Sequence, residues 1–300
     1  MAAKAVLVRT EVTTDQLGGK TVKANLSKFY MAVLGASLLL APTFAHAGEV
    51  LDRITSRGSM KMATDSNLPP LSFLNEQNQL DGFDVDVGKE VARRLGVKLE
   101  IVTPEWTVIT AGNWSGRWDI SIGSMTPTAD RARIFDFPAV YYYNPASFAV
   151  HKDSKIQTKE DLNGKVIGAP SGTTYEKYVN QDLKIDAVGV PSFTYEVKPG
   201  TVKTLTATTA LMDDLRLGPG VRLDGIINSL PSLNEAIKKG YPFRVVGSPV
   251  FYEPLAIAIE KNDKEFGQKL SEVVKAMQAD GTLSKLSEKW FGVDYTKATQ

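Results

Sequence analysis

Apolar and polar positions alternate along the chain from residue 48 onward in a way that predicts strands followed by helices. Residues 83–95 place Val87 and Val91 on one face of an amphipathic helix, and Gly96 fits the left-handed position that ends it. Short apolar runs on either side are typical of buried strands. The strands that we expect are residues 59–64, 98–102, 119–124, 147–152, 165–170, 223–228 and 255–261. This alternation predicts an α/β fold with a mainly parallel sheet.

The same pattern divides the chain into two lobes. A second block of strands and helices begins near residue 146, and a later apolar strand and two helices return to the first block. Residues 192–208 are rich in Thr, Pro and Gly, and we assign no element to them from the sequence. The expected division is lobe 1 from residues 48–144 plus 251–300 and lobe 2 from residues 145–250. Such an interrupted lobe implies two hinge crossings.

The N-terminal segment has a different character. Three lysines precede the apolar run 31–42, and Ala45-His46-Ala47 fits the small-x-small rule for cleavage. The run is too short to span a bilayer as a stable anchor. We therefore predict a signal peptide over residues 1–47, cleaved after about Ala47, and a mature protein in the periplasm.

The composition narrows the classes of function. With 43% hydrophobic and 23% charged residues the chain is ordinary for a globular protein, and a formal net charge of +1 gives no reason to expect nucleic acid as a partner. The absence of cysteine excludes disulfides and thiolate nucleophiles. His151 is the one histidine after residue 47, and no nucleophile motif or metal-ligand cluster accompanies it. We expect no catalytic residue, no metal and no cofactor.

One turn carries the residue types of an anion site. An apolar strand ends in Gly123, Ser124 and Thr126, and the helical turn that follows carries Arg131. A strand that leads into a helix offers free backbone N–H groups, and arginine forms paired bonds with planar oxyanions. Taken alone, the segment favours a surface arginine beside an ordinary turn, and the rest of the chain reverses this preference toward a carboxylate site.

Six segments, taken together, resemble the family 3 bacterial extracellular solute-binding proteins, the periplasmic polar amino acid receptors of ABC importers. The segments begin ATDSNLPP, LDGFDVDV, SIGSMTPT, KEDLNGKV, VRLDGII and ADGTLSKL, and they follow the family's order from about residue 49 to residue 292. The resemblance implies a type II periplasmic binding protein-like fold, with a ligand cleft between two lobes joined by a two-strand hinge.

The resemblance also implies a ligand site. Arg131 would hold the ligand carboxylate with the residues of its turn, a second strand-to-helix turn at residues 171–174 would grip it from lobe 2, and Trp106 would stack on the ligand. The ligand-binding residues that we expect are Asp65, Leu68, Trp106, Gly123, Ser124, Thr126, Arg131, Gly172, Thr173, Thr174, Asn228 and Ser229.

The chain departs from the family at positions that bear on the ligand. Relatives that bind α-amino acids usually carry an acid where this chain has Ser229, next to Asn228, and the acid holds the α-ammonium group. Opine-binding relatives tolerate a small polar residue there. Leu68 and Leu71 replace aromatic residues common in the pocket loop. Either Asp65 binds the ammonium group, or the ligand is not a simple α-amino acid.

We therefore predict a solute-binding protein of an ABC importer and not an enzyme. As a monomer it would capture an amino acid, an opine or a related small carboxylate by lobe closure, and would deliver it to an inner-membrane permease and its ATPase. One alternative is an enzyme like the cyclohexadienyl dehydratases of the same fold. Their general acid lies where this chain has Tyr175, with Glu176 one residue later. A binding protein that serves chemoreception is the other alternative.

Overall fold

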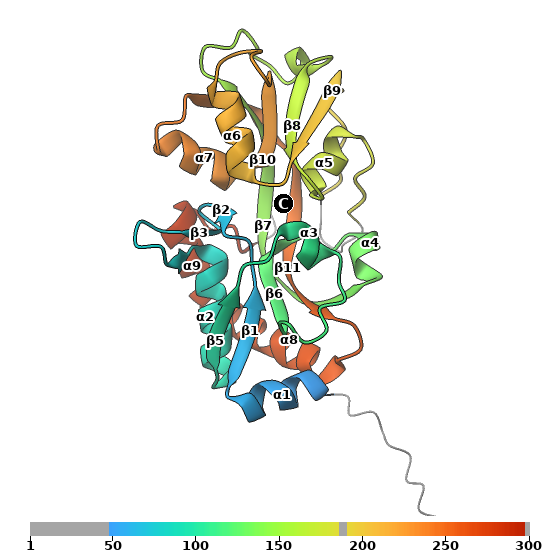
Figure 1. Cartoon of the computed structure of the whole chain (residues 1–300), viewed down its shortest axis with the longest axis vertical. Helices are drawn as coiled ribbons and strands as arrows, with labels where there is room; N and C mark the ends of the chain where they lie inside the picture. Colours follow the sequence, from blue (N-terminus) through green and yellow to red (C-terminus); the bar gives the residue numbers. More distant parts are fainter. Residues whose placement is uncertain (1–47, 186–190, 298–300) are drawn as a thin grey trace, which may run out of the picture. The chain divides into compact units, whose positions relative to one another are not determined.

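The computed structural model describes residues 48–185 and 191–297 (Figure 1). The predicted signal peptide, residues 1–47, lies outside the described residues. The strands are β1 (Ser59–Ala63), β2 (Asn67–Leu68), β3 (Ser72–Leu74), β4 (Leu80–Asp81), β5 (Lys98–Val102), β6 (Ile120–Met125), β7 (Phe135–His151), β8 (Val166–Pro170), β9 (Thr201–Leu205), β10 (Gly225–Ser229) and β11 (Phe243–Glu260). The helices are α1 (Glu49–Arg57), α2 (Phe83–Leu95), α3 (Trp106–Thr110), α4 (Ala129–Ala132), η1 (Glu160–Leu162), α5 (Thr174–Val179), α6 (Thr208–Arg216), α7 (Leu230–Lys238), α8 (Lys264–Ala279) and α9 (Thr282–Phe291).

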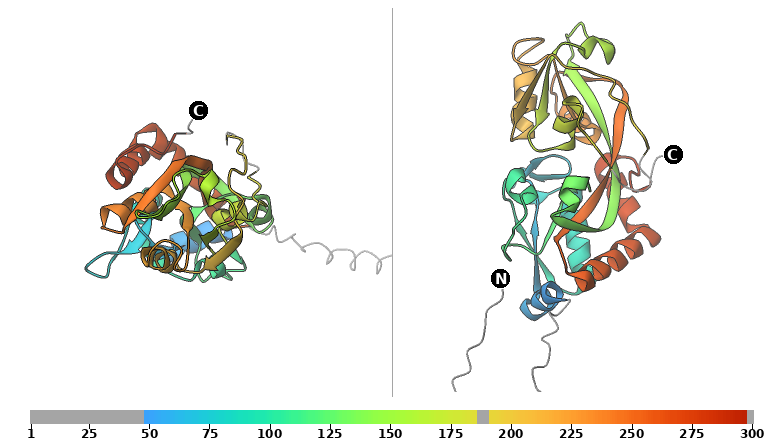
Figure 2. Two further views of the ribbon diagram at one scale, coloured as in Figure 1. Left: turned by 90° about the horizontal axis from the view of Figure 1, so that it is seen from above. Right: turned by 90° about the vertical axis from the view of Figure 1, so that its right-hand side faces the viewer.

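One sheet runs through both lobes. Its strand order is β5-β1-β6-β11-β7-β10-β8-β9, and β2, β3 and β4 form a small separate sheet. The long strands β7 and β11 pair with each other in both halves of the large sheet, with Asn144 opposite Glu253 at the crossing between lobes. Figures 1 and 2 show these two strands side by side from different directions. The predicted two-lobed fold with a two-strand hinge is confirmed.

The sheet is mixed, whereas the sequence predicted a mainly parallel one. Pairs β1–β5, β1–β6, β8–β9 and β8–β10 are parallel, but β7 and β11 pair in antiparallel fashion with each other and with their outer neighbours. Sequence patterns predicted only the apolar ends of these two strands. Prolines at positions 138, 145, 249 and 254 obscure the remainder, because proline lacks the N–H that a strand interior needs.

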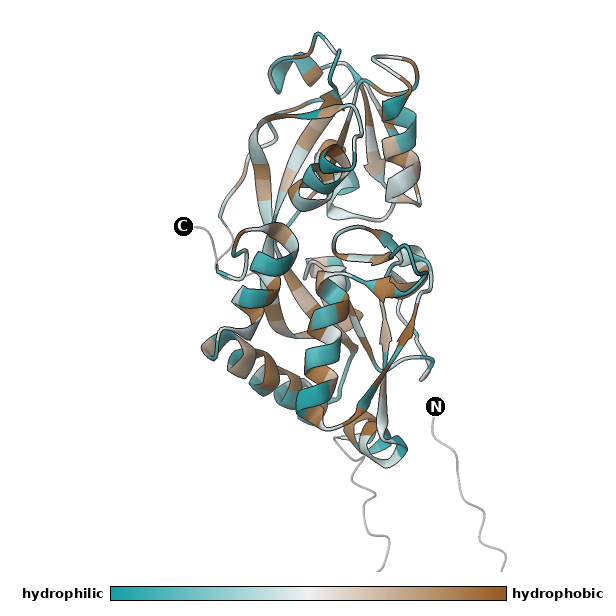
Figure 3. Ribbon diagram, turned by 90° about the vertical axis from the view of Figure 1, so that its left-hand side faces the viewer, coloured by the Kyte–Doolittle hydropathy of each residue, from teal (hydrophilic) through white to brown (hydrophobic). Residues whose placement is uncertain are grey.

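Each lobe has its own apolar core. In the first lobe a buried cluster joins Met62 and Phe83 to Ile257, which lies far away in the sequence. In the second lobe Phe148 and Tyr178 belong to a separate cluster. The helices in Figure 3 carry both hydrophilic and hydrophobic residues, as expected for helices that cover a sheet with one face. These clusters support the predicted lobes, whose boundaries at 144/145 and 250/251 stay a prediction.

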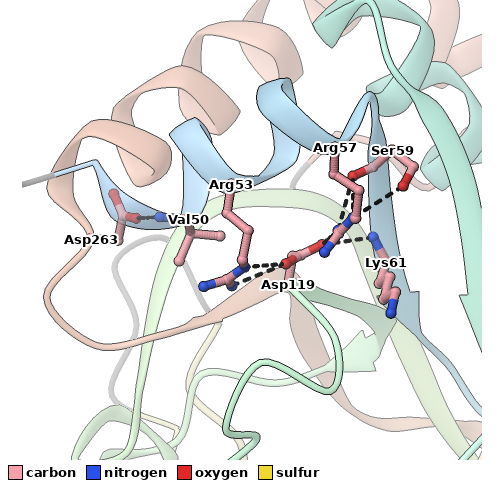
Figure 4. A network of polar contacts seen from close by, with 7 residues as sticks. All are labelled: Val50, Arg53, Arg57, Ser59, Lys61, Asp119 and Asp263. Carbon is pink, nitrogen blue, oxygen red and sulfur yellow. Dashed lines mark hydrogen bonds and ion pairs between the residues drawn. The ribbon is translucent and has the colours of Figure 1, made fainter.

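Helix ends follow the local sequence. Gly96 ends α2 in the left-handed conformation, with φ of 73°, as predicted. The sequence pattern missed α1, which a network of charges fastens to the first lobe (Figure 4). Asp119 is buried before β6, accepts hydrogen bonds from Arg53 (3.0 Å) and from the backbone N–H of Lys61 (2.8 Å), and pairs with Arg57. None of the helices among the described residues is long and apolar enough to cross a membrane.

Candidate functional site

A cavity lies between the two lobes beside the hinge. The strand-to-helix turns of both lobes open onto it, and β11 contributes one side chain from the hinge itself. The residues that line it are Asp65, Leu68, Leu71, Trp106, Gly123, Ser124, Thr126, Arg131, Pro170, Ser171, Thr173, Thr174, Tyr175, Thr206, Thr208, Asn228 and Glu253.

The structure brings most of the predicted site residues together around this cavity. Gly172 and Ser229 are the two predicted residues that do not line it. The carbonyl of Gly172 nevertheless accepts hydrogen bonds from two cavity residues, and Ser229 is fully buried next to Asn228 in the chain. The site residues therefore remain a proposal that this arrangement supports.

Arg131 is held rigidly at one side of the cavity. It lies on the short helix α4, whose N-cap Thr128 accepts a hydrogen bond from the backbone N–H of Arg131. Its guanidinium donates to the carbonyls of Thr126 (3.0 Å) and Gly172 (3.1 Å) and lies over the ring of Trp106, 5.2 Å from its centre. A guanidinium has five N–H donors, so others remain for a ligand. Burial lowers the pKa of Arg131 to about 10, and the charge of Glu253 opposes this shift, so the group stays cationic at neutral pH.

In the strand-to-helix turn of the second lobe, residues 171–174, side chains close in sequence already bind backbone N–H groups. Thr173 caps α5 by accepting from the backbone N–H of Glu176, and the N–H of Gly172 donates to the Glu176 carboxylate at 2.6 Å. This pattern is a variant of the capping box, in which Glu176 pairs with the N–H of the residue before the N-cap and not with that of the N-cap itself. The backbone N–H of Gly172 is thus already paired, and what Gly172 offers to the opposite side of the cleft is its carbonyl.

Ser124 is tied to a buried polar network behind the cavity. Its hydroxyl donates to Asp84 (2.7 Å) and contacts the hydroxyl of Tyr142 (2.6 Å), while Tyr141 donates to the other oxygen of Asp84 at 2.7 Å. Burial raises the pKa of Asp84 to about 7, although the bonds from Ser124 and Tyr141 act in the opposite direction. The network fixes the strand end that presents Ser124 to the cavity.

Sequence reasoning missed Glu253, which lies in the hinge. One oxygen of its carboxylate accepts from Thr126 (2.5 Å) and Thr174 (2.6 Å), one from each lobe, and the other accepts from Asn144 at 3.1 Å. The sequence carried a signal for it, because Glu253 is an acid inside the otherwise apolar run 249–259. Of the other lining residues, Leu71 and Ser171 lie in the pocket loop and the turn that the sequence indicated, whereas Pro170, Tyr175, Thr206 and Thr208 were not predicted.

Asp65 is a second acid at the cavity. Its carboxylate accepts from the backbone N–H of Asn67 at 2.8 Å, which shapes the loop after β1. Burial, with a smaller contribution from the charge of Glu105, raises the pKa of Asp65. Asp65 is therefore a poorer fixed charge than its position alone suggests. The described residues contain no cluster of side chains suited to a metal ion.

The geometry defines a two-lobed binding protein, and comparison with known proteins gives its family. Residues 60–293 match the family model of the bacterial extracellular solute-binding proteins, family 3, and the chain belongs to this family. Among curated relatives, the L-cystine-binding protein TcyJ of Escherichia coli is 30% identical over 270 residues, which cover 89% of this chain and 95% of TcyJ. The L-arginine-binding protein of Pseudomonas aeruginosa is 28% identical over 276 residues, covering 88% of this chain and 97% of the relative.

Solved structures show the same fold. An ancestral amino acid-binding protein, AncCDT-1, described as a precursor of cyclohexadienyl dehydratase, is 31% identical with a TM-score of 0.69, covering 80% of this chain and 99% of its own. A mutant of ArgBP from T. maritima is 27% identical with the same TM-score, covering 81% of this chain and 99% of its own. The predicted family is thus confirmed.

Proposed function

We propose that this protein binds an amino acid between its lobes and delivers it to an ABC permease. The observation that carries the proposal is that a cationic Arg131 and a buried Glu253 carboxylate both line one cavity at the hinge. The names of the relatives, which include cystine- and arginine-binding proteins, support an amino acid as ligand. They also support an importer of the ABC type as the partner.

The carboxylate of the ligand binds Arg131 in this proposal. The guanidinium is held flat between two carbonyls and the ring of Trp106, which leaves its remaining N–H groups in a fixed plane. A planar carboxylate matches this geometry, and charge-assisted bonds of this kind are about twice as strong as neutral ones. The contacts with Thr126 and Trp106 lie within the first lobe, so they reduce the conformational entropy that the arginine loses when the ligand arrives.

Contacts across the cleft explain how binding couples to closure. Trp106 and Arg131 from the first lobe both donate to the carbonyl of Gly172, and Lys177 of the second lobe pairs with Asp130 at 2.8 Å. These contacts form only when the lobes are together. A ligand that touches both sides therefore shifts the population toward the closed form, which the permease recognises.

The proposed place of action is the periplasm, after cleavage near Ala47. Mass spectrometry of the exported protein would locate the new N-terminus. We expect a monomer, which sedimentation would test.

Affinity measurements on residues 48–300 test the proposed function. A panel of the twenty amino acids and L-cystine should contain a ligand that raises the melting temperature by roughly 5–10 °C at a hundred times its Kd. Arg131→Ala should lower the affinity for that ligand by about 100-fold or more, because the carboxylate of the bound ligand would be buried without a charged partner. Arg133→Ala is the matched control, since its side chain is 78% exposed and pairs only with Asp130 among the described residues. Equal affinities of the two variants would show that Arg131 does not bind the ligand.

The structure gives no support to the dehydratase alternative. Tyr175 occupies the position of the expected general acid and accepts a hydrogen bond from Asn144 at 2.9 Å. Glu176, one residue later, is engaged with the backbone of Gly172. We therefore propose binding without catalysis.

A further inference from the structure

Glu253 is buried and forms no ion pair, although its charge acts on Arg131 from across the cavity. Its exposed fraction is 2%, and its three hydrogen bonds come from the neutral groups of Thr126, Thr174 and Asn144. Within the described residues no ion pair includes this side chain. A carboxylate can accept about four hydrogen bonds, and a buried charge is costly unless it is paired. The site thus has a negative charge available for a cation.

Thr126 sets the spacing between the two charged groups of the cavity. Its carbonyl accepts from the guanidinium of Arg131 at 3.0 Å, and its hydroxyl donates to Glu253 at 2.5 Å. One residue therefore touches both the cation and the anion of the protein. Two opposite charges separated by the width of one residue fit the carboxylate and ammonium groups on a single carbon atom.

Asn144 explains why the acid lies in the hinge and not at position 229. The hydroxyl of Ser229 donates to Oδ1 of Asn144 at 2.8 Å, which turns Nδ2 of Asn144 toward Glu253. A carboxylate at position 229 would face Oδ1 of Asn144, and two acceptors repel each other. Rotating the Asn144 amide by 180° would only place the same oxygen against the carboxylate of Glu253. Because one amide cannot donate to carboxylates on both sides, Ser229 and Glu253 are a matched pair.

Asn228 cannot replace Glu253 as a receptor for a cation. Its Oδ1 accepts the backbone N–H of Ser229 at 2.7 Å, which fixes the orientation of the amide. Nδ2 of Asn228 is buried and has no hydrogen-bond partner in the described part of the chain. Asn228 lines the cavity, and its free amide N–H groups are suited to donate to an oxygen of the ligand.

We infer that Glu253 binds the primary α-ammonium group of the ligand and so selects free α-amino acids over N-acylated and amino-free analogues. The inference rests on the proposed function and adds to it the residue that reads the amino group. It differs from both alternatives that Ser229 left open, because Glu253 on the hinge strand, and neither Asp65 nor a residue of β10, supplies the negative charge for the ammonium group.

Ligand analogues and one variant test this inference together. L-Arginine and L-cystine serve as probes, with Nα-acetyl-L-arginine and N,N′-diacetyl-L-cystine as analogues that keep the carboxylates but lose the ammonium charge. Isothermal titration should show that the wild-type protein binds the better free amino acid at least about 30-fold more tightly than its acetylated form, a ratio expected for a buried charge pair. Glu253→Gln should lose most of this ratio, whereas Glu272→Gln, on the exposed face of α8, should retain it.

Each result has a defined meaning. Equal binding of free and acetylated probes by the wild-type protein would overturn the role of Glu253 while leaving amino acid binding intact, and this arm needs no variant to fold. A variant Glu253→Gln that keeps the wild-type ratio would overturn it as well. Failure of the wild-type protein to bind any member of the amino acid panel would overturn the proposed function itself, and this inference with it.

Discussion

Asp84→Asn should remove a pH-dependent loss of stability that is built into the first lobe. Asp84 lies in the first turn of α2 with none of its surface exposed, and hydroxyls of Ser124 and Tyr141 donate to its two oxygens at 2.7 Å. The substitution keeps the shape of the side chain and removes the ionisable group. Any difference in pH dependence between the two proteins then belongs to this carboxyl.

The size of the effect follows from the pKa of Asp84. Burial raises it from 3.8 to about 7. Between these values the unfolded chain has lost a proton that the folded protein keeps, so stability is greatest at low pH and falls as the pH rises toward 7. The slope is about 1.4 kcal/mol per pH unit, which gives about 3 kcal/mol between pH 4.5 and pH 7.5. Above pH 7.5 both states are largely ionised and the loss levels off.

Urea denaturation of both proteins across this pH range measures the effect. The free energy of unfolding of the wild-type protein, relative to that of Asp84→Asn, should fall by about 3 kcal/mol from pH 4.5 to pH 7.5. Hydrogen bonds lower the pKa of Glu90 (mainly from Arg93) and of Asp280 (mainly from Thr282) to about 2. These two groups titrate alike in both proteins, so their effects on stability cancel in the difference. A difference that stays constant with pH would refute the proposed protonation of Asp84.

Two further substitutions test other parts of the structure. Trp106→Phe removes the N–H that donates to the carbonyl of Gly172 at 3.2 Å, and ligand affinity measured by titration should fall by about 3- to 10-fold with the unliganded melting temperature nearly unchanged; an unchanged affinity would mean that this bond does not hold the closed form. Asp119→Ala removes the buried partner of Arg53 and Arg57, whose side chains are 36% and 28% exposed and so can still reach water. This substitution should lower the free energy of unfolding by about 1–3 kcal/mol and the melting temperature by roughly 3–10 °C in a thermal scan. A shift below 1 °C would contradict the anchoring role of Asp119.

The sequence predicted the fold better than it predicted the cavity. Periodic elements such as α2 were found with their ends, because amphipathic spacing and a glycine cap are local properties. The long strands β7 and β11 were found only in part, because prolines interrupt their pattern and their pairing joins distant parts of the chain. Helix α1 was missed, since it is held by contacts of Arg53 and Arg57 with Asp119 and not by an apolar stripe alone.

The candidate site shows the same limit. Arg131 and the two strand-to-helix turns could be predicted because their chemistry is contained in short segments. Glu253 could not, since its role depends on Thr126, Thr174 and Asn144, which approach it from three other elements. A single acid in an apolar strand marks a position of interest, but only its neighbours in space show what that acid can bind.

The hinge has a mechanical consequence. Both crossings between the lobes belong to strands that stay hydrogen-bonded to each other, with Tyr143, Asn144 and Pro145 opposite Pro254, Glu253 and Tyr252. A hydrogen-bonded pair of strands resists stretching and shear but can bend and twist, so it acts as an elastic hinge and not as a flexible linker. The lobes can therefore swing apart along a narrow path and return to the same alignment on each cycle. When the lobes close on a ligand, Arg131 and Gly172 therefore approach each other in the correct orientation, and little reorientation of the lobes is needed.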